Sequence, residues 1–174
     1  FVKQGSGTLA LTGASTYTGG TTVNEGTLQL GAGGALASGG ALTVNGGAFD
    51  LNGGSQSVGA LSGSGGTIAL GGGTLTTNSA SNTVLASAIT GSGSFVKQGS
   101  GTLILTGANS YTGGTTVSGG ILQGTTAALQ GSIVNNATVV FNQATNGTYA
   151  GAMSGNGALV KTGTGNLTLT GANS

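Results

Sequence analysis

The chain has 174 residues, including 40 Gly and no Pro, Cys or His, and its net charge of +1 comes from three Lys against one Asp and one Glu. The absence of Cys excludes a disulfide framework and zinc–thiolate sites, and three cations cannot make the basic patch that nucleic acids require, so we expect no nucleic-acid partner. A hydrophobic fraction of 36% provides enough apolar surface for a core, and no apolar run approaches the roughly 18 residues of a membrane span.

The predicted elements are short strands, met first at 8–12 (TLALT) and 27–30 (TLQL). Similar runs follow at 67–70, 102–106 and 166–170. Each run places Leu or Ile at every second position, with mostly small or polar residues between them, which is the period of a strand with one apolar face. Gly-rich turns follow the runs, and no stretch shows the apolar period of a helix, so we predict an all-β fold.

The opening segment recurs along the chain. Residues 95–117 repeat 1–23 with three differences, and a third, partial copy begins at 159. We place the copies at 1–28, 95–122 and 159–174, the third truncated, within a single β-helix segment that spans 1–174. The interval between the first two copies is longer than the interval between the last two. We interpret the difference as one whole turn inserted between 66 and 95, which stacked repeats accept without loss of register. The truncated copy is typical of a piece of a longer array.

Short parallel strands separated by Gly-rich turns favour a right-handed parallel β-helix, or β-solenoid, of several rungs. A turn of about 20 to 25 residues would divide the chain into roughly seven to nine rungs, each about 4.8 Å high. Leu, Ile and Val would stack inward in columns, among them Leu105, and Thr, Ser and Asn would face outward. The absence of Pro fits this architecture, because Pro cannot donate a hydrogen bond in a paired strand.

The longest motif is G-x-G-x-L-x-L-T-G-x-x-x-Y-T-G-G-T-T-V-x-x-G-x-L, which runs from Gly5 to Leu28 and again from Gly99 to Leu122. It resembles the autotransporter-associated β-strand repeat, found in the passenger regions of type V secretion in Gram-negative bacteria. The resemblance implies a passenger β-helix that is exported across the outer membrane and lies at the cell surface or outside the cell. It also implies that the repeat helps export and folding, while adhesive or enzymatic functions often sit elsewhere on the passenger.

The two carboxylates are the candidates for catalysis. Glu25 and Asp50 are separated in the sequence by about one turn, so the coil could bring them together as a glycosidase pair. Neither recurs in the second copy, and no His or Cys is present to act as or activate a nucleophile. We therefore interpret both as solvated surface charges and predict no enzyme and no catalytic residue. A single Asp also excludes the calcium-binding nonapeptide repeat, and we predict no metal or cofactor.

All three Lys occupy one position of the repeat, as Lys3, Lys97 and Lys161. They could form a row of cations for anionic glycans or lipopolysaccharide. We favour the alternative in which each stem covers apolar neighbours while the ammonium group stays in water, and we expect Lys97→Ala to affect folding little. Tyr17 and Tyr111 could stack on a sugar, but we favour packing at a corner of the turn, with the hydroxyl bound to the backbone.

These patterns predict a mechanical role: a rigid, nearly uncharged stalk in a cell-surface or secreted protein, with adhesion, self-association or biofilm formation as readouts. Its partners would be copies of itself or components of the cell surface or matrix, through ligand residues that the sequence does not identify. One alternative is an extracellular filament subunit that stacks head to tail through open β-helix ends. A further alternative is an ice-binding β-solenoid, suggested by Thr-rich runs at 74–76 and 167–170, although these runs are irregular.

Overall fold

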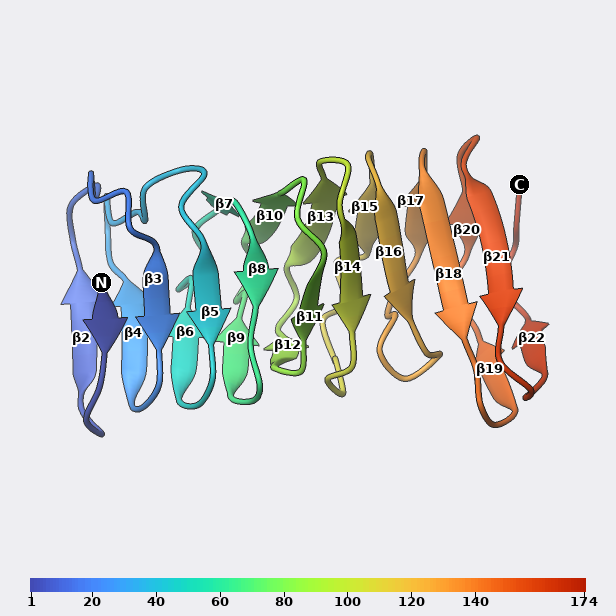
Figure 1. Ribbon diagram of the computed structural model, residues 1–174, viewed down its shortest axis with the longest axis horizontal. Helices are drawn as coiled ribbons and strands as arrows, with labels where there is room; N and C mark the ends of the chain where they lie inside the picture. Colours follow the sequence, from blue (N-terminus) through green and yellow to red (C-terminus); the bar gives the residue numbers. More distant parts are fainter.

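The computed structural model describes all 174 residues as a parallel β-solenoid of about eight turns, with 22 strands and no helix. Successive turns lie side by side along the long axis, and the two termini lie in the first and last turns (Figure 1). No helix that could cross a membrane is present. The predicted all-β, parallel solenoid is confirmed, while the right-handed sense of the coil stays a prediction.

Each turn passes through three faces. On the first face, one sheet contains β1 (Val2–Lys3), β3 (Thr21–Val23), β5 (Leu42–Val44) and β8 (Leu61–Ser62). A bridge between Gly63 and Leu85 leads to the second sheet of this face, which contains β11 (Thr83–Leu85), β14 (Thr102–Leu105), β16 (Ile121–Gly124), β18 (Thr138–Asn142) and β21 (Ala158–Thr162).

The second face contains β2 (Thr8–Leu11), β4 (Thr27–Leu30), β6 (Ala48–Asp50), β9 (Thr67–Ala69) and β12 (Ala88–Thr90), and in the last turns the pair β19 (Gly147–Tyr149) and β22 (Leu167–Leu169). The third face contains β7 (Gln56–Val58), β10 (Thr74–Asn78), β13 (Ser94–Gln98), β15 (Thr115–Val117), β17 (Ile133–Asn135) and β20 (Met153–Ser154). All the strand pairs on these faces are parallel.

The pairing register gives the length of a turn. Gln29 pairs with Asp50, which lies 21 residues later in the sequence. A shorter turn begins in β16, where Leu122 pairs with Val139 and where Thr126 binds Gln143, 17 residues later. Turns of 20 or 21 residues lie near the short end of the predicted range, and the turn of 17 residues lies below it. The count of about eight turns lies within the predicted seven to nine.

Alternation within the strands builds one continuous core. In β14 the side chains of Leu103 and Leu105 are buried, and 28 such residues from all the faces form a single hydrophobic cluster. The inward assignment of Leu105, which is 1% exposed, is confirmed. The exceptions lie at the two ends of the rod: Leu9 is 37% exposed, and Leu11, Leu167 and Leu169 are half-buried, because β2 and β22 are edge strands with no further turn to cover them on one side.

The three copies of the repeat do not lie on the same face. The first strand of the motif is β1 on the first face in copy one, β13 on the third face in copy two, and β21 on the first face in copy three. The interpretation of the difference between the two intervals as one whole inserted turn that keeps register is therefore wrong, because the second copy starts on another face than the first and third. The chain completes more than four but fewer than five turns between β1 and β13, so the same sequence folds equally well on two different faces.

Candidate functional site: the buried polar core of the repeat

The Lys residue of the repeat lies inside the solenoid, enclosed by carbonyl groups. Lys97 is on the inward side of β13 and only 2% exposed. Its Nζ donates hydrogen bonds to the carbonyl oxygens of Gln98 at 2.7 Å, Gly99 at 2.9 Å and Gly119 at 3.1 Å. Two of these carbonyls belong to its own turn and the third to the next turn, so one side chain connects two turns.

The first copy repeats this arrangement on another face. Lys3 is 6% exposed, and its Nζ donates to the carbonyl oxygens of Gln4 at 3.0 Å, Gly5 at 2.6 Å and Glu25 at 3.1 Å. In the third copy Lys161 is exposed and donates to the Gly163 carbonyl. The expectation of an ammonium group in water is therefore wrong for the first two copies, and the row of cations on one face does not form. In these two copies the Lys stems extend inward and their ammonium groups bind turn carbonyls.

Burial governs the electrostatics of this site. Removal from water lowers the pKa of Lys97, because the charged form loses hydration. The three carbonyl dipoles partly replace that hydration, which is the condition for tolerating a buried charge. No buried side-chain nitrogen or oxygen in the structure lacks a hydrogen-bond partner. The site is therefore a structural clamp that satisfies turn carbonyls, and it presents no cation to an outside ligand.

The clamp explains one Gly that both full copies of the motif contain. Gly26 and Gly120, at equivalent places in the two copies, both have φ of +62°. A Cβ at Gly120 would collide with the carbonyl oxygens of Gly99 and Gly101. A Cβ at Gly26 would collide with the equivalent carbonyl oxygens, those of Gly5 and Gly7, and with the Nζ of Lys3. Only Gly combines this left-handed backbone with so close an approach of the preceding turn.

The Tyr of the motif packs inward at the next corner. Tyr111 is 1% exposed, its ring lies 6.3 Å from that of Phe95, and its hydroxyl is 2.6 Å from the Thr115 hydroxyl. Tyr17 makes the same contact with Thr21 at 2.8 Å. The prediction of packing is confirmed, and the Tyr111 hydroxyl has the backbone of Gln130 as a partner in addition to the Thr115 side chain, which we did not expect. Burial raises the pKa of the Tyr111 phenol, although its hydrogen bond to Thr115 acts in the opposite direction.

Side-chain amides take the place of missing strand pairs, a feature that the sequence analysis missed. The Oδ1 of Asn109 accepts from the Ile89 amide at 2.7 Å, and its Nδ2 donates to the Ala128 carbonyl at 2.6 Å, so this residue connects the turns on both sides of its own. Asn173, its equivalent in the third copy, accepts from the Met153 amide at 3.0 Å. The sequence held one signal for this role. The position of Asn109 is occupied by Ser15 in the first copy, and it is one of the three positions at which the two full copies differ.

The carboxylates do not form a catalytic pair. Asp50 ends β6, where Gln29 donates to it at 2.8 Å and the Asn52 amide donates at 2.8 Å. Glu25 lies exposed in the turn before β4. Because Asp50 pairs with Gln29 inside β4 and Glu25 lies in the turn that precedes β4, the two carboxylates lie toward opposite ends of neighbouring strands. The glycosidase arrangement is therefore absent, and no group of three or more His, Cys, Asp or Glu that could hold a metal ion is present.

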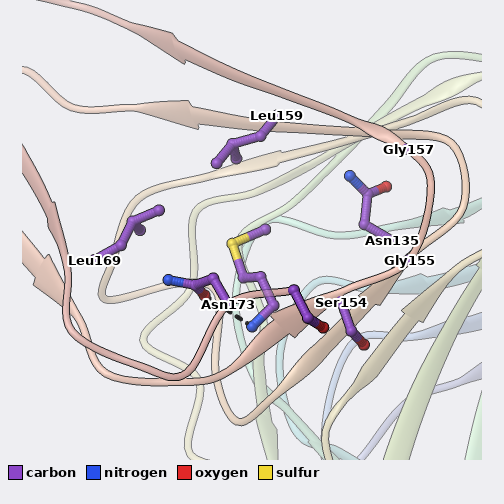
Figure 2. A pocket seen from close by; sticks show the side chains of 9 residues that line it. Asn135, Ser154, Gly155, Gly157, Leu159, Leu169 and Asn173 are labelled. Carbon is purple, nitrogen blue, oxygen red and sulfur yellow. Dashed lines mark hydrogen bonds between the residues drawn. The ribbon is translucent and has the colours of Figure 1, made fainter.

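The last turn contains a cavity of about 320 Å³ (Figure 2). Met153, Leu159 and Leu169 line it, and each pairs with a core residue of the turn before. Figure 2 shows the side chain of Asn173 in the cavity, with its hydrogen bond to the backbone of Met153. The cavity is therefore the solenoid interior as it appears at the last turn, and no charged side chain lines it.

Comparison with known proteins agrees with these features. The model of the passenger-associated-transport-repeat family matches residues 1–30, 95–123 and 159–174. The chain is 38% identical over 164 residues to the adhesin BmaC autotransporter of Brucella suis biovar 1, a match that covers 91% of this chain and 5% of that protein. No solved structure matches the chain. The chain therefore carries the passenger-associated transport repeat at these three places, and most of its length is distantly homologous to a short stretch of an autotransporter adhesin.

Proposed function

We propose that this segment is a rigid stalk in the passenger of a surface adhesin of a Gram-negative bacterium, and that it is not an enzyme. The observation that carries this proposal is the single hydrophobic core, which connects the turns from Val23 to Met153 without a break that could act as a hinge, while partly buried side chains of the two end turns pack against it. About eight turns at about 4.8 Å each make a rod of about 38 Å. The name of the relative, an autotransporter adhesin, supports the proposal that this segment belongs to an adhesive protein. The match covers only 5% of that relative, which supports the proposal that this segment is one stretch of a long passenger.

The copies of the repeat would give the rod fixed points for folding. In the second copy, Lys97 and Asn109 together make hydrogen bonds to the turns before and after their own. Formation of one such copy orders about three turns, and each further turn then adds to an existing edge, as expected for a linear array. This order of events suits a chain that folds after export, and the name of the passenger-associated transport repeat supports a role in transport.

Negative-stain electron microscopy of the purified native protein tests the stalk. We expect single thin rods of one fixed length, set by the length of the chain. Long fibres built from many chains would overturn the stalk and favour the head-to-tail filament. The ice-binding alternative stays a prediction, and measurement of thermal hysteresis would test it.

A further inference from the structure

The chain contains four Asn–Gly pairs, which differ in how firmly the fold holds them. They are Asn45–Gly46, Asn52–Gly53, Asn146–Gly147 and Asn156–Gly157. Asn is a thermolabile residue because its side-chain amide can be lost. An Asn that precedes Gly is especially prone to this loss, because the Gly has no side chain to shield the backbone nitrogen that attacks the amide. The attack also requires the pair to rotate into a reactive geometry, so a pair that the fold holds in place is protected.

Two of the pairs are fixed to a neighbouring turn by their backbone amides. The Gly147 amide donates to the Asn166 carbonyl at 2.8 Å, and the Asn166 amide donates in return to the Oδ1 of Asn146 at 2.9 Å. The Gly157 amide donates to the Asn135 carbonyl at 2.8 Å. In both pairs the nitrogen that would attack already takes part in the bonding between turns.

The pair at Asn45 is held mainly by its side chain. Its Nδ2 donates to the Oδ1 of Asn24 at 3.1 Å, and its Oδ1 accepts from the Ser64 hydroxyl at 3.3 Å. These partners belong to the turns before and after its own. The Gly46 amide also donates to the Val23 carbonyl at 3.4 Å. The side-chain amide of Asn45 therefore cannot rotate toward the backbone without breaking bonds to both neighbouring turns.

The pair Asn52–Gly53 makes no bond of this kind. Neither the Gly53 amide nor the Asn52 side chain has a hydrogen-bond partner, and both residues are exposed. One local bond closes this turn, from the Gly54 amide to the Leu51 carbonyl at 2.8 Å. Asn52 has a φ of +49°, which L residues disfavour, and it is the one non-Gly residue with a positive φ. A surface hollow of about 420 Å³, lined by Asn52 and by residues 30–34 of the preceding turn, gives room to the side chain and to water.

We propose that Asn52 is a site of spontaneous deamidation, with the Gly53 amide nitrogen as the nucleophile and water as the co-reactant. This nitrogen forms a bond to Cγ of Asn52, the bond from Cγ to Nδ2 breaks, and the Gly53 amide proton leaves with Nδ2 as ammonia. The product is a cyclic succinimide. Water then opens the ring at either of its carbonyl groups and gives aspartate, or isoaspartate with an extra methylene in the backbone. The net reaction takes up one water and releases one ammonia, with no oxidation or reduction.

The products change a crowded corner between β6 and β7. Either product adds one negative charge to a chain whose net charge is +1. The next turn approaches closely here, because a Cβ on Gly71 would lie 2.7 Å from the Gly53 nitrogen and 3.0 Å from its Cα. Isoaspartate lengthens the backbone at this contact and would displace the next turn, whereas aspartate leaves the backbone unchanged. Deamidation would therefore loosen the rod at one defined corner as the protein ages.

Peptide mapping by mass spectrometry of the full chain, kept in a mildly alkaline buffer, tests the proposal. Each hydrogen bond that must break lowers the reactive population by roughly twofold to tenfold. We therefore expect Asn52 to lose ammonia more than about tenfold faster than Asn45 and Asn146, which have at least two such bonds, and about fivefold faster than Asn156, which has one. Conversion at any of these three pairs that equals the conversion at Asn52 would overturn the proposal.

Two variants and the denatured chain supply the controls. Asn52→Gln should abolish most of the isoaspartate that a protein isoaspartyl methyltransferase detects, because Gln must close a larger ring, whereas Asn156→Gln should leave it nearly unchanged. In denaturant, where the bonds between turns are absent, the four pairs should convert at similar rates. An isoaspartate signal that survives Asn52→Gln would refute the site, and so would the same ratios of rates in the native and the denatured chain.

The effect on the rod has its own measurement. Aged protein enriched in isoaspartate should unfold at a lower temperature than Asn52→Asp, which carries the same added charge on a normal backbone. Equal unfolding temperatures would refute the displacement of the next turn.

Discussion

Replacement of Lys97 by Met removes the ammonium group but keeps most of the apolar stem. Three carbonyl oxygens then lose their donor, and those of Gly99 and Gly119 belong to turns outside the strands. An unsatisfied acceptor costs about 1–3 kcal/mol, and because these turns are only half-buried we take about 1 kcal/mol for each, or about 3 kcal/mol in total. For a domain of this size, each kcal/mol lowers Tm by roughly 2–4 °C, so we expect a fall of about 6–12 °C.

Thermal unfolding followed by circular dichroism measures this effect. Lys161→Met is the matched control, because the equivalent ammonium group in the third copy is exposed, and we expect its Tm to stay close to that of the wild type. A Lys97→Met protein that unfolds at the wild-type temperature would refute the clamp. Lys97→Ala should be more destabilising still, since it also removes the packed stem, in contrast to the small effect expected from the sequence.

Leu105→Asp buries an unpaired charge and should lower the free energy of unfolding by about 4 kcal/mol or more. Ile104→Asp, one residue earlier on the outer side of the same strand, should leave denaturant unfolding nearly unchanged. Equal effects of the two variants would contradict the assigned faces. Gly120→Ala should lower Tm strongly because its Cβ meets backbone at a φ of +62°, whereas Gly7→Ala, with open space around it, should not; a tolerated Gly120→Ala would show that the turn can shift. Burial raises the pKa of Tyr149, so above about pH 10 the unfolded chain binds fewer protons than the folded one and unfolding free energy falls. Denaturant titrations of Tyr149→Phe should show a shallower fall, and an identical slope would argue against this origin.

The sequence predicted the architecture because the signal is local and repeated. Alternation in runs such as 102–106 determines which side chains face inward, and Gly-rich turns limit each strand to a few residues. The relative position of the copies was not predictable in the same way. It depends on turn lengths that differ along the chain, as between the turn from Gln29 to Asp50 and the shorter one from Leu122 to Val139, and these differences add up over several turns.

The candidate site was less predictable than the fold. A Lys in a polar repeat normally keeps its ammonium group in water, so burial was not expected. One of the carbonyl groups that bind Lys97 belongs to Gly119, which is 22 residues away in the sequence. Likewise, the role of Asn109 depends on amide and carbonyl groups of two other turns. Such partners become visible only when the stacking of the turns is known.

The most direct test of the solenoid is the mass per length of single rods, measured by scanning transmission electron microscopy at low protein concentration. A segment of 16.1 kDa in about eight turns, each about 4.8 Å high, predicts about 4 kDa per nanometre. That value in unpaired rods would support one coiled chain per rod. A compact particle, or a single rod with a value several-fold different, would contradict the stacked parallel turns on which the stalk depends.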